Sequence, residues 1–587
     1  NPGGWYTDGT SVTVTATPDE GYAFVFWEGD VPPGASIYDN ILEVPADRPR
    51  TLTACFGSTG AGADKYWMGT AAGGDGIRWD LNANWSPAGV PTITDRVFIT
   101  NGAPLVSSTA SARAITITNG TLTVTGGTGR PHVSVTVAED LSLLAGATMA
   151  VTAGRGSNPT NHAAIYAEAN PVTVGGTMRI AAGGVFKPIA DVLTGVPVFV
   201  TAGDFVLEEG GKVDASGQGY GWELAVGTLP PGAIQNNDGY TFTPGRGWNY
   251  NYGAAYGANS SSGSAKAYGY AYAPWLPGSP SGLHGKYASS PTGRYHFNGW
   301  AHGGGAARIH ATGRMSLAGW IDCNGHYRFY GGPSGGGIWL TAPAFMIYRT
   351  AKLTAEGGHT ASNYGNGSAG TGGRISLGAG LTDEQISCLA TGRPPASLSL
   401  AYGSPTFITT SVVGGFSPGL TLINGESRAR QNAGTSTYTL NTNAAVMLDV
   451  AAVGVEGASA INGHAILRTG EPASLDVETF KLAADARSHF IASSWTVTNA
   501  LGSVVAGGTG GTATFTPAPG ATRLWLTWTL SAIEDEVDFA IVGEGTATTN
   551  GAAASCGTWR LARGTAVQLA AAPGAGAAFG MWHTDVP

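Results

Sequence analysis

The chain is poor in charge, in cysteine and in long apolar runs. Only 12% of its 587 residues are Asp, Glu, Lys or Arg, and their balance gives a formal net charge of −9. General nucleic-acid binding depends on clustered Lys and Arg that neutralise phosphates, and this balance argues against it. No apolar run approaches the roughly 18 residues of a helical membrane span. We therefore expect no nucleic-acid partner and no membrane span in this segment.

The four cysteines do not have the spacing of metal ligands. Cys55 and Cys556 lie near opposite ends of the chain, so neighbouring units that joined through their ends could cross-link them in an inter-unit disulfide. Two lone buried thiols are the alternative. Alignment of internal repeats puts Cys323 where Ala215 and Ala355 stand in other repeats, which predicts a buried free thiol.

Glycine is abundant, with 92 residues, in a chain too apolar for disorder and too rich in Gly for helical bundles. Its length predicts three or more domains. Short alternating runs such as those at 114–118 and 133–137, with Gly at nearly every corner, are typical of coils in a parallel β-helix. The predicted fold class is all-β: a right-handed parallel β-helix flanked by small β repeat modules and a β-sandwich.

The last 24 residues repeat a segment near the start. Residues 9–32 align without a gap on residues 564–587, and the twelve identical positions are Gly9, Thr10, Val12, Ala16, Pro18, Gly21, Ala23, Phe24, Trp27, Asp30, Val31 and Pro32. This repeat predicts one long period of a tandem array, cut inside the same small module at both ends. We expect the chain to be a piece of a larger repetitive protein.

Residues 1–57 combine an alternating strand with the patterns Pro-x-x-Gly-Tyr-x-Phe, Trp-x-Gly-Asp-Val-Pro and Arg-x-Leu-Thr-Ala-x-Phe. This segment resembles the divergent internalin-type B-repeats of large bacterial surface proteins. The resemblance implies an extracellular or cell-surface location and a small β module that serves as a spacer or adhesive bead, without catalytic residues. It also implies that Trp27 and Trp582 are core residues.

The sequence predicts five regions. They are a B-repeat-like module at 1–57, a linker at 58–65, a parallel β-helix at 66–404, a β-sandwich at 405–532 and a second B-repeat-like module at 533–587. Residues 67–95 resemble the opening of secreted bacterial β-helix proteins, which implies an aromatic cap. Within the β-helix region, Thr382, Gln385 and Gly392 predict a short helix near 382–391.

Four polar side chains in the expected cap suggest a calcium site, as an alternative to a chain that binds no metal. Asp75, Asp80, Asn82 and Asp95 carry the oxygen ligands that Ca²⁺ prefers. Asp and Asn in turns more often cap their own backbone. The prediction is that the chain holds no cofactor or metal.

An aromatic and basic insertion at 239–300 interrupts the β-helix pattern. No acidic residue falls between Asp238 and Asp322, although the chain is acidic overall. Three interpretations remain open: a loop that packs on the coils, a self-assembly surface, or a glycan-binding surface. The candidate contact residues are Trp248, Tyr250, Tyr252, Tyr256, Tyr268, Tyr270, Tyr272, Trp275, Arg294 and Trp300.

The sequence gives little support for a catalytic function. Polysaccharide hydrolases need two carboxylates across a sugar bond, and Asp214 and Asp322 occupy equivalent repeat positions. Acidic residues at coil corners are more often solubilising. Arg308 and Arg374, each just before the Ile of a glycine-led strand, predict a structural ladder.

The favoured interpretation is a structural repeat unit of a giant extracellular fibre or cell-surface protein. Such units would assemble end to end through their terminal β modules, without catalysis, so that the partner is another unit. A glycan-binding adhesin that uses the aromatic insertion is the first alternative. A β-helix polysaccharide lyase or hydrolase is the second.

Overall fold

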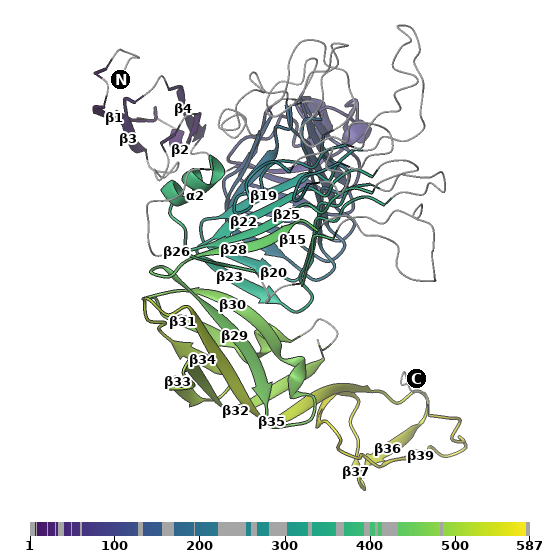
Figure 1. Ribbon diagram of the computed structural model, residues 1–587. Coiled ribbons are helices and arrows are strands. Elements are labelled where there is room, and N and C mark those ends of the chain that lie inside the picture. Colours follow the sequence, from purple (N-terminus) through teal and green to yellow (C-terminus); the bar gives the residue numbers. More distant parts are fainter. Residues whose placement is uncertain are drawn as a thin grey trace, which may run out of the picture. The chain divides into compact units, whose positions relative to one another are not determined.

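The computed structural model describes residues 6–582, except 8, 20–21, 30, 33–39, 48–49, 59–61, 108, 127–132, 155–169, 193, 221–253, 260–266, 281–301, 327–331, 360–368, 393–399, 405–408, 414–432, 482–484 and 486. The chain forms two compact units, Asn1–Val446 with Ile466–Thr469, and Met447–Ala465 with Gly470–Pro587. Strands dominate both units (Figure 1), which confirms the all-β prediction.

The N-terminal module consists of two antiparallel strand pairs. β1 (Ser11–Thr15) pairs with β3 (Ile41–Pro45), and β2 (Tyr22–Gly29) pairs with β4 (Leu52–Ser58). Period-two alternation turns the apolar residues of β1 and β3 to one face. The core that results contains Ala16, Trp27, Leu42 and Val44, with Phe24 packed against it.

Three tryptophans lie where the aromatic cap is expected. The rings of Trp67 and Trp79 each meet Trp85 edge to face, at 5.1 and 4.8 Å between centroids, and Trp85 Nε1 donates to Trp79 O at 2.8 Å. β5 (Asp64–Trp67) pairs with β6 (Trp85–Ser86) and, in parallel, with β7 (Arg96–Ile99). The cluster therefore lies beside the first of the parallel strands.

Three ladders of parallel strands follow, and the chain visits them in turn. The first ladder contains β9 (Thr109–Ala112), β12 (Ser134–Val137), β15 (Asn170–Ile180), β17 (Val198–Leu207), β19 (Ala306–Ala311), β22 (Gly337–Ala342), β25 (Arg374–Ala379) and β28 (Thr435–Asn441). The second contains β7, β10 (Ala114–Ile117), β13 (Leu141–Leu143), the later halves of β15 and β17, β20 (Arg314–Leu317) and β23 (Ala344–Tyr348). The third contains β8 (Leu105–Val106), β11 (Thr121–Thr125), β14 (Thr148–Thr152), β16 (Val185–Ile189), β18 (Lys212–Asp214), β21 (Trp320–Asp322), β24 (Lys352–Thr354) and β27 (Thr409–Ser411).

This order of pairing is consistent with the predicted parallel β-helix, because neighbouring strands of one ladder come from successive passes of the chain. Equivalent apolar side chains stack in register along a ladder, and in the second ladder one fully buried column contains Ile99, Ile117, Leu143, Ile180, Leu207, Leu317 and Ile347. Right-handed winding remains a prediction from the usual hand of parallel crossovers.

Glycine-rich segments join the third ladder to the first and bond to one another through their backbones. In the described part of the chain, residues 332–336 bond in this way to six other segments, through Ala254, Ser279, Gly304, Cys323, Gly358 and Thr371. A Cβ on Gly336 would lie 1.9 Å from Gly305 O, and a Cβ on Gly304 would lie 1.8 Å from Cys323 O. Neither glycine has a positive φ. These positions need glycine because neighbouring backbones leave no room for a side chain, as at the collagen axis.

The predicted short helix is confirmed, but the predicted boundary after it is wrong. α2 (Asp383–Ala390) begins with a capping box between Thr382 and Gln385, and Gly392 follows with φ +72°. β27 and β28 then continue the third and first ladders. The ladders therefore extend to Asn441 and do not end at residue 404, because strands that alternate like sandwich strands pair in parallel with earlier coils.

The second unit contains two sheets that face each other. β35 (Arg523–Phe539) pairs with β29 (Ala445–Val453) and β32 (Ser488–Asn499), and β32 also pairs with β33 (Val504–Thr509). β31 (Ala473–Asp476) pairs with β34 (Thr512–Phe515). The rings of Trp495 and Phe515 lie 6.4 Å apart and join the two sheets, as in a small sandwich.

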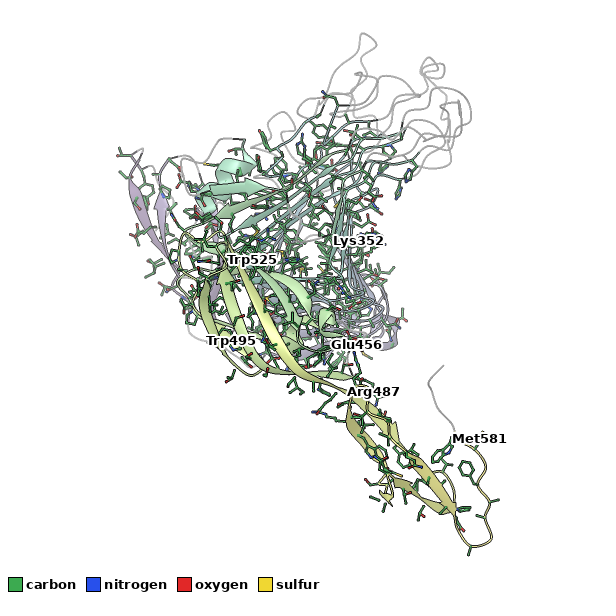
Figure 2. The ribbon with its side chains drawn as sticks, turned by 60° about the horizontal axis from the view of Figure 1, so that its bottom comes forward. Lys352, Glu456, Arg487, Trp495, Trp525 and Met581 are labelled. Carbon is green, nitrogen blue, oxygen red and sulfur yellow. The ribbon has the colours of Figure 1, made fainter. Side chains whose placement is uncertain are left out.

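The C-terminal module extends from the end of β35. β38 (Gly557–Ala562) pairs with the last residues of β35, and β36 (Gly545–Thr549) pairs with β37 (Ala552–Ala553) and β39 (Leu569–Pro573). Nearly all side chains of this module are exposed, including Met581 at 77% (Figure 2). Among the described residues, no helix is long and apolar enough to cross a membrane.

Candidate functional site

The aromatic insertion is only partly described. Trp248, Tyr250, Tyr252, Arg294 and Trp300 lie outside the described residues. The other candidate contact residues fall in 254–259 and in 267–280, and we call the second segment the strap.

The strap lies against the first ladder. Its backbone carbonyls at Tyr268, Ala271 and Tyr272 accept hydrogen bonds from Arg374 Nε (3.2 Å), Thr437 Oγ1 (3.0 Å) and Ser376 Oγ (2.9 Å). These three donors come from β25 and β28. The strap therefore covers outward-facing positions of the first ladder.

This cover explains an unusual burial pattern. In β17 of the same ladder buried residues mostly alternate with partly exposed ones, whereas every residue of β22 and β25 is buried. Under this cover, the Arg308 guanidinium stacks 4.1 Å from the centroid of the Trp339 ring and donates to Thr341 Oγ1 at 2.8 Å. Arg308 and Arg374 thus both serve packing, but the predicted ladder of these two residues is wrong, because Arg308 is in register with Trp339 and Ser376, whereas Arg374 is in register with Gly337 and Ala306.

His310 joins the same cluster, which the sequence did not reveal. Its Nδ1 lies 2.8 Å from Thr341 Oγ1. Burial, together with the positive charge of Arg308, lowers the pKa of His310 to about 3, so the imidazole stays neutral at ordinary pH. The only sequence signal for the cluster was the shared register of these residues in successive coils.

Two of the candidate contact residues serve packing. Tyr256 and Trp275 are fully buried, Trp275 Nε1 donates to Ala390 O at 3.0 Å, and its ring meets Phe199 edge to face at 6.4 Å. Burial raises the pKa of Tyr256 well above its ordinary value. A buried ring cannot contact a glycan or a neighbouring unit, so for these two residues the structure favours the packing alternative.

Three further tyrosines differ in their exposure. The Tyr268 hydroxyl donates to Pro277 O at 2.6 Å and accepts from Ser279 Oγ at 2.9 Å, and its ring lies 4.7 Å from that of Tyr256. Tyr270 is half-buried, whereas Tyr272 is 39% exposed. Of the described candidates, Tyr272 is the one most available for an external contact.

The third ladder brings Asp214 and Asp322 together. They are register partners on β18 and β21, and Lys212 Nζ lies 3.3 Å from Asp214 Oδ1 and 3.0 Å from Asp322 Oδ2. Burial opposes the charge of Lys212, but the two carboxylates outweigh burial and raise its pKa. Lys212 Nζ also lies 4.1 Å above the Trp320 ring. The cation occupies the space between carboxylates that a sugar substrate would need.

The four oxygen-bearing residues considered for calcium lie apart in two turn regions. Asp75 Oδ1 accepts from Asn84 Nδ2 and from the amides of Ile77 and Arg78, and these hydrogen bonds lower its pKa. Asp95 accepts from Thr92 and Ala63, while Asn82 Oδ1 accepts from Val90 N. Both regions have the geometry of Asx caps. Within the described ranges no group of three or more His, Cys, Asp or Glu side chains is placed to hold a metal.

The cysteines differ sharply in environment. Cys323 is a buried free thiol, as predicted, and burial raises its pKa well above the ordinary value. Cys556 is an exposed free thiol. The side chain of Cys55 lies outside the described residues, so a disulfide between neighbouring units stays a prediction.

The repeated segments at the two ends share a ring geometry but differ in burial. Phe24 and Trp27 lie 5.5 Å apart at 52°, and the equivalent Phe579 and Trp582 lie 5.4 Å apart at 55°. Trp27 is 5% exposed, whereas Trp582 is 45% exposed. The expectation of a core residue is confirmed for Trp27 and wrong for Trp582 in this structure, because no strands like β3 and β4 cover it within the described residues.

Comparison with known proteins identifies one part of the chain. Residues 1–60 match the family model of the divergent InlB B-repeat domain. Searches among curated proteins and among solved structures gave no significant match. The B-repeat resemblance is thus supported for the N-terminal module, and it is consistent with a surface or structural repeat protein.

Proposed function

We propose that the chain is a structural, non-catalytic segment of a large extracellular or cell-surface protein, joined end to end to like units through its terminal β modules. The observation that carries the proposal is the recurrence of one module type at both ends of the chain. A B-repeat-type module stands at residues 1–60 and its repeat at 564–587, with three parallel ladders between them.

The ladders support a scaffold role because their polar groups serve packing. Arg308, Arg374 and Lys212 each hold a side-chain partner on a neighbouring strand. The two carboxylates considered for hydrolysis share one lysine. Groups engaged in this way stabilise stacked coils and are poorly placed to act on a substrate.

Assembly in solution tests the proposal. The full chain and a variant that lacks residues 1–57 would be concentrated and compared by electron microscopy and light scattering. We expect linear end-to-end assemblies for the full chain and dispersed particles for the variant. Long assemblies that persist without residues 1–57, or dispersed full chain at every concentration, would contradict the proposal.

A further inference from the structure

The repeated segments at 9–32 and 564–587 each contain one equivalent strand, β1 and β39, and its hydrogen bonds differ between the two modules. In the N-terminal module, Thr10 O accepts from Ala46 N and Ala16 N donates to Asn40 O, both at 2.8 Å. Alternate residues of a strand direct their backbone groups to opposite edges. The residues of β1 with even numbers therefore face β3.

In the C-terminal module the equivalent strand, β39, uses its other edge. Gln568 O accepts from Asn550 N at 2.8 Å, and Gly574 N donates to Glu544 O at 3.0 Å, so these positions face β36. Their equivalents in the repeat are positions 13 and 19, which have odd numbers. β39 is thus paired along the edge opposite to the one that β1 uses.

Superposition of β39 on β1, the equivalent strands of the repeat, gives one sheet of three strands. The superposed strand lies in the centre, with β36 along one edge and β3 along the other. In the C-terminal module, the positions of β39 that correspond to Val14 and Ala16 direct their backbone groups to the edge away from β36.

The side chains agree with the backbone. In the N-terminal module Leu42 and Val44 of β3 lie opposite Val14 and Val12, and together with Trp27 they form the buried core. In the C-terminal module the equivalents of Val14, Phe24 and Trp27 are Leu569, Phe579 and Trp582, which are 38%, 48% and 45% exposed. Ring geometry is already the same at both ends, so a segment that covered these residues would meet a preformed face.

We propose that the edge of β39 that pairs with no strand among the described residues, with the apolar face of Leu569, Phe579 and Trp582, is a docking surface for a segment with two strands of the β3 and β4 type from a like unit, which we call the β3–β4 segment. This segment adds its β3-type strand to the edge of β39 by backbone hydrogen bonding. Its residues equivalent to Leu42, Val44 and Leu52 cover the exposed rings. This inference rests on the proposed function, since a like unit supplies the β3–β4 segment, and it specifies which strand pairs with which edge.

Covalent attachment of the β3–β4 segment to the whole chain tests the inference at high effective concentration. Residues 33–58 would be appended after Pro587 of the full chain, and hydroxyl-radical footprinting would report the oxidation of Trp582 and Phe579. We expect oxidation of both rings to fall several-fold, toward the level at Trp27, which serves as an internal reference. Hydrogen exchange at 566–573 should slow in parallel.

A matched control carries Leu42→Asp and Val44→Asp in the appended copy alone. This control should leave Trp582 as reactive as in the unmodified chain. Unchanged oxidation of Trp582 with the native appended segment, or equal protection by the substituted segment, would overturn the inference. Because this readout needs no assembly, its failure is distinct from a failure of the chain to form end-to-end assemblies.

Discussion

At the scale of single residues, the space available at a position explains why it holds glycine or cysteine. Gly304 and Gly336 lie among backbone carbonyls that an added Cβ would strike. Cys323 fills a small inward position equivalent to Ala215 and Ala355, all three fully buried. Interiors packed to this density do not relax freely around added atoms.

Gly336→Ala should therefore destabilise the first unit by about 1–3 kcal/mol or more, the usual cost of overpacking. The control is Gly580→Ala, since Gly580 has open space around its Cα and no positive φ. Thermal unfolding compares the two variants with the parent chain. Equal melting temperatures for the two variants would contradict this account of the glycine-rich segments.

Thiol labelling should separate Cys323 from Cys556. Burial withholds Cys323 from the reagent and raises its pKa, which suppresses the reactive thiolate. We expect a maleimide to modify the exposed Cys556 rapidly in the native chain and Cys323 only after unfolding. Mass spectrometry of tryptic peptides checks the order, and native labelling of Cys323 at a comparable rate would refute its burial.

At the scale of elements, the strap changes the character of the first ladder. Strands that would show one polar face to water are buried on both faces where residues 267–280 cover them. The aromatic residues of the insertion accordingly divide into packing residues and residues that remain candidates for contact.

Trp275→Ala should lower the free energy of unfolding by about 3–5 kcal/mol, as is usual when a buried aromatic ring is removed. It also removes the hydrogen bond to Ala390 O. Tyr272 lies in the same segment but is 39% exposed, so Tyr272→Ala should lower the free energy of unfolding much less. Urea unfolding followed by circular dichroism compares them. A larger effect for Tyr272 than for Trp275 would reverse our assignment of the covered face.

The junction of β35 with β38 should be sensitive to acid. A hydrogen bond from Arg563 lowers the pKa of Asp535 to about 2, and hydrogen bonds from Thr558 and Arg487 lower the pKa of Asp538. Both carboxyls have lower pKa values in the folded chain than in the unfolded chain. Their stabilisation is therefore present above about pH 4 and lost as pH falls toward 2.

Hydrogen exchange of residues 557–562, corrected for intrinsic rates, should show protection that declines between pH 5 and pH 2.5, roughly the range set by these pKa values. The effect is modest because the groups are exposed. Arg563→Gln should lower protection at pH 7 and flatten its dependence on pH. An unaltered pH profile in this variant would show that the ion pairs do not stabilise the junction.

At the scale of the whole molecule, the chain divides into two compact units with different architectures. Strands of the parallel ladders pair with their neighbours in the ladder, and the second unit has its own aromatic core around Trp495, Phe515 and Trp528. Each unit thus has a separate source of stability.

Calorimetry should accordingly resolve two transitions. Gly336→Ala should lower the transition temperature of the first unit and leave that of the second unit unchanged. Trp528→Ala, at a fully buried site of the second unit, should lower the transition temperature of the second unit and leave that of the first unchanged. A single transition that both substitutions shift equally would mean that the two units unfold together.

Local patterns in the sequence predicted the elements whose causes are local. Period-two alternation and corner glycines indicated the short strands, and Thr382 with Gln385 indicated α2 because a capping box needs only four consecutive residues. The repeat of residues 9–32 indicated that both ends carry the same module type. Equivalence to Ala215 and Ala355 indicated a buried Cys323.

Only the tertiary structure decided which surfaces meet. It carried the parallel ladders on to Asn441, buried Tyr256 and Trp275 under the strap, and left Trp582 exposed while Trp27 is covered. The physical reason is that alternation specifies which face of a strand is apolar but not which segment will cover that face. That choice depends on contacts between residues far apart in the chain.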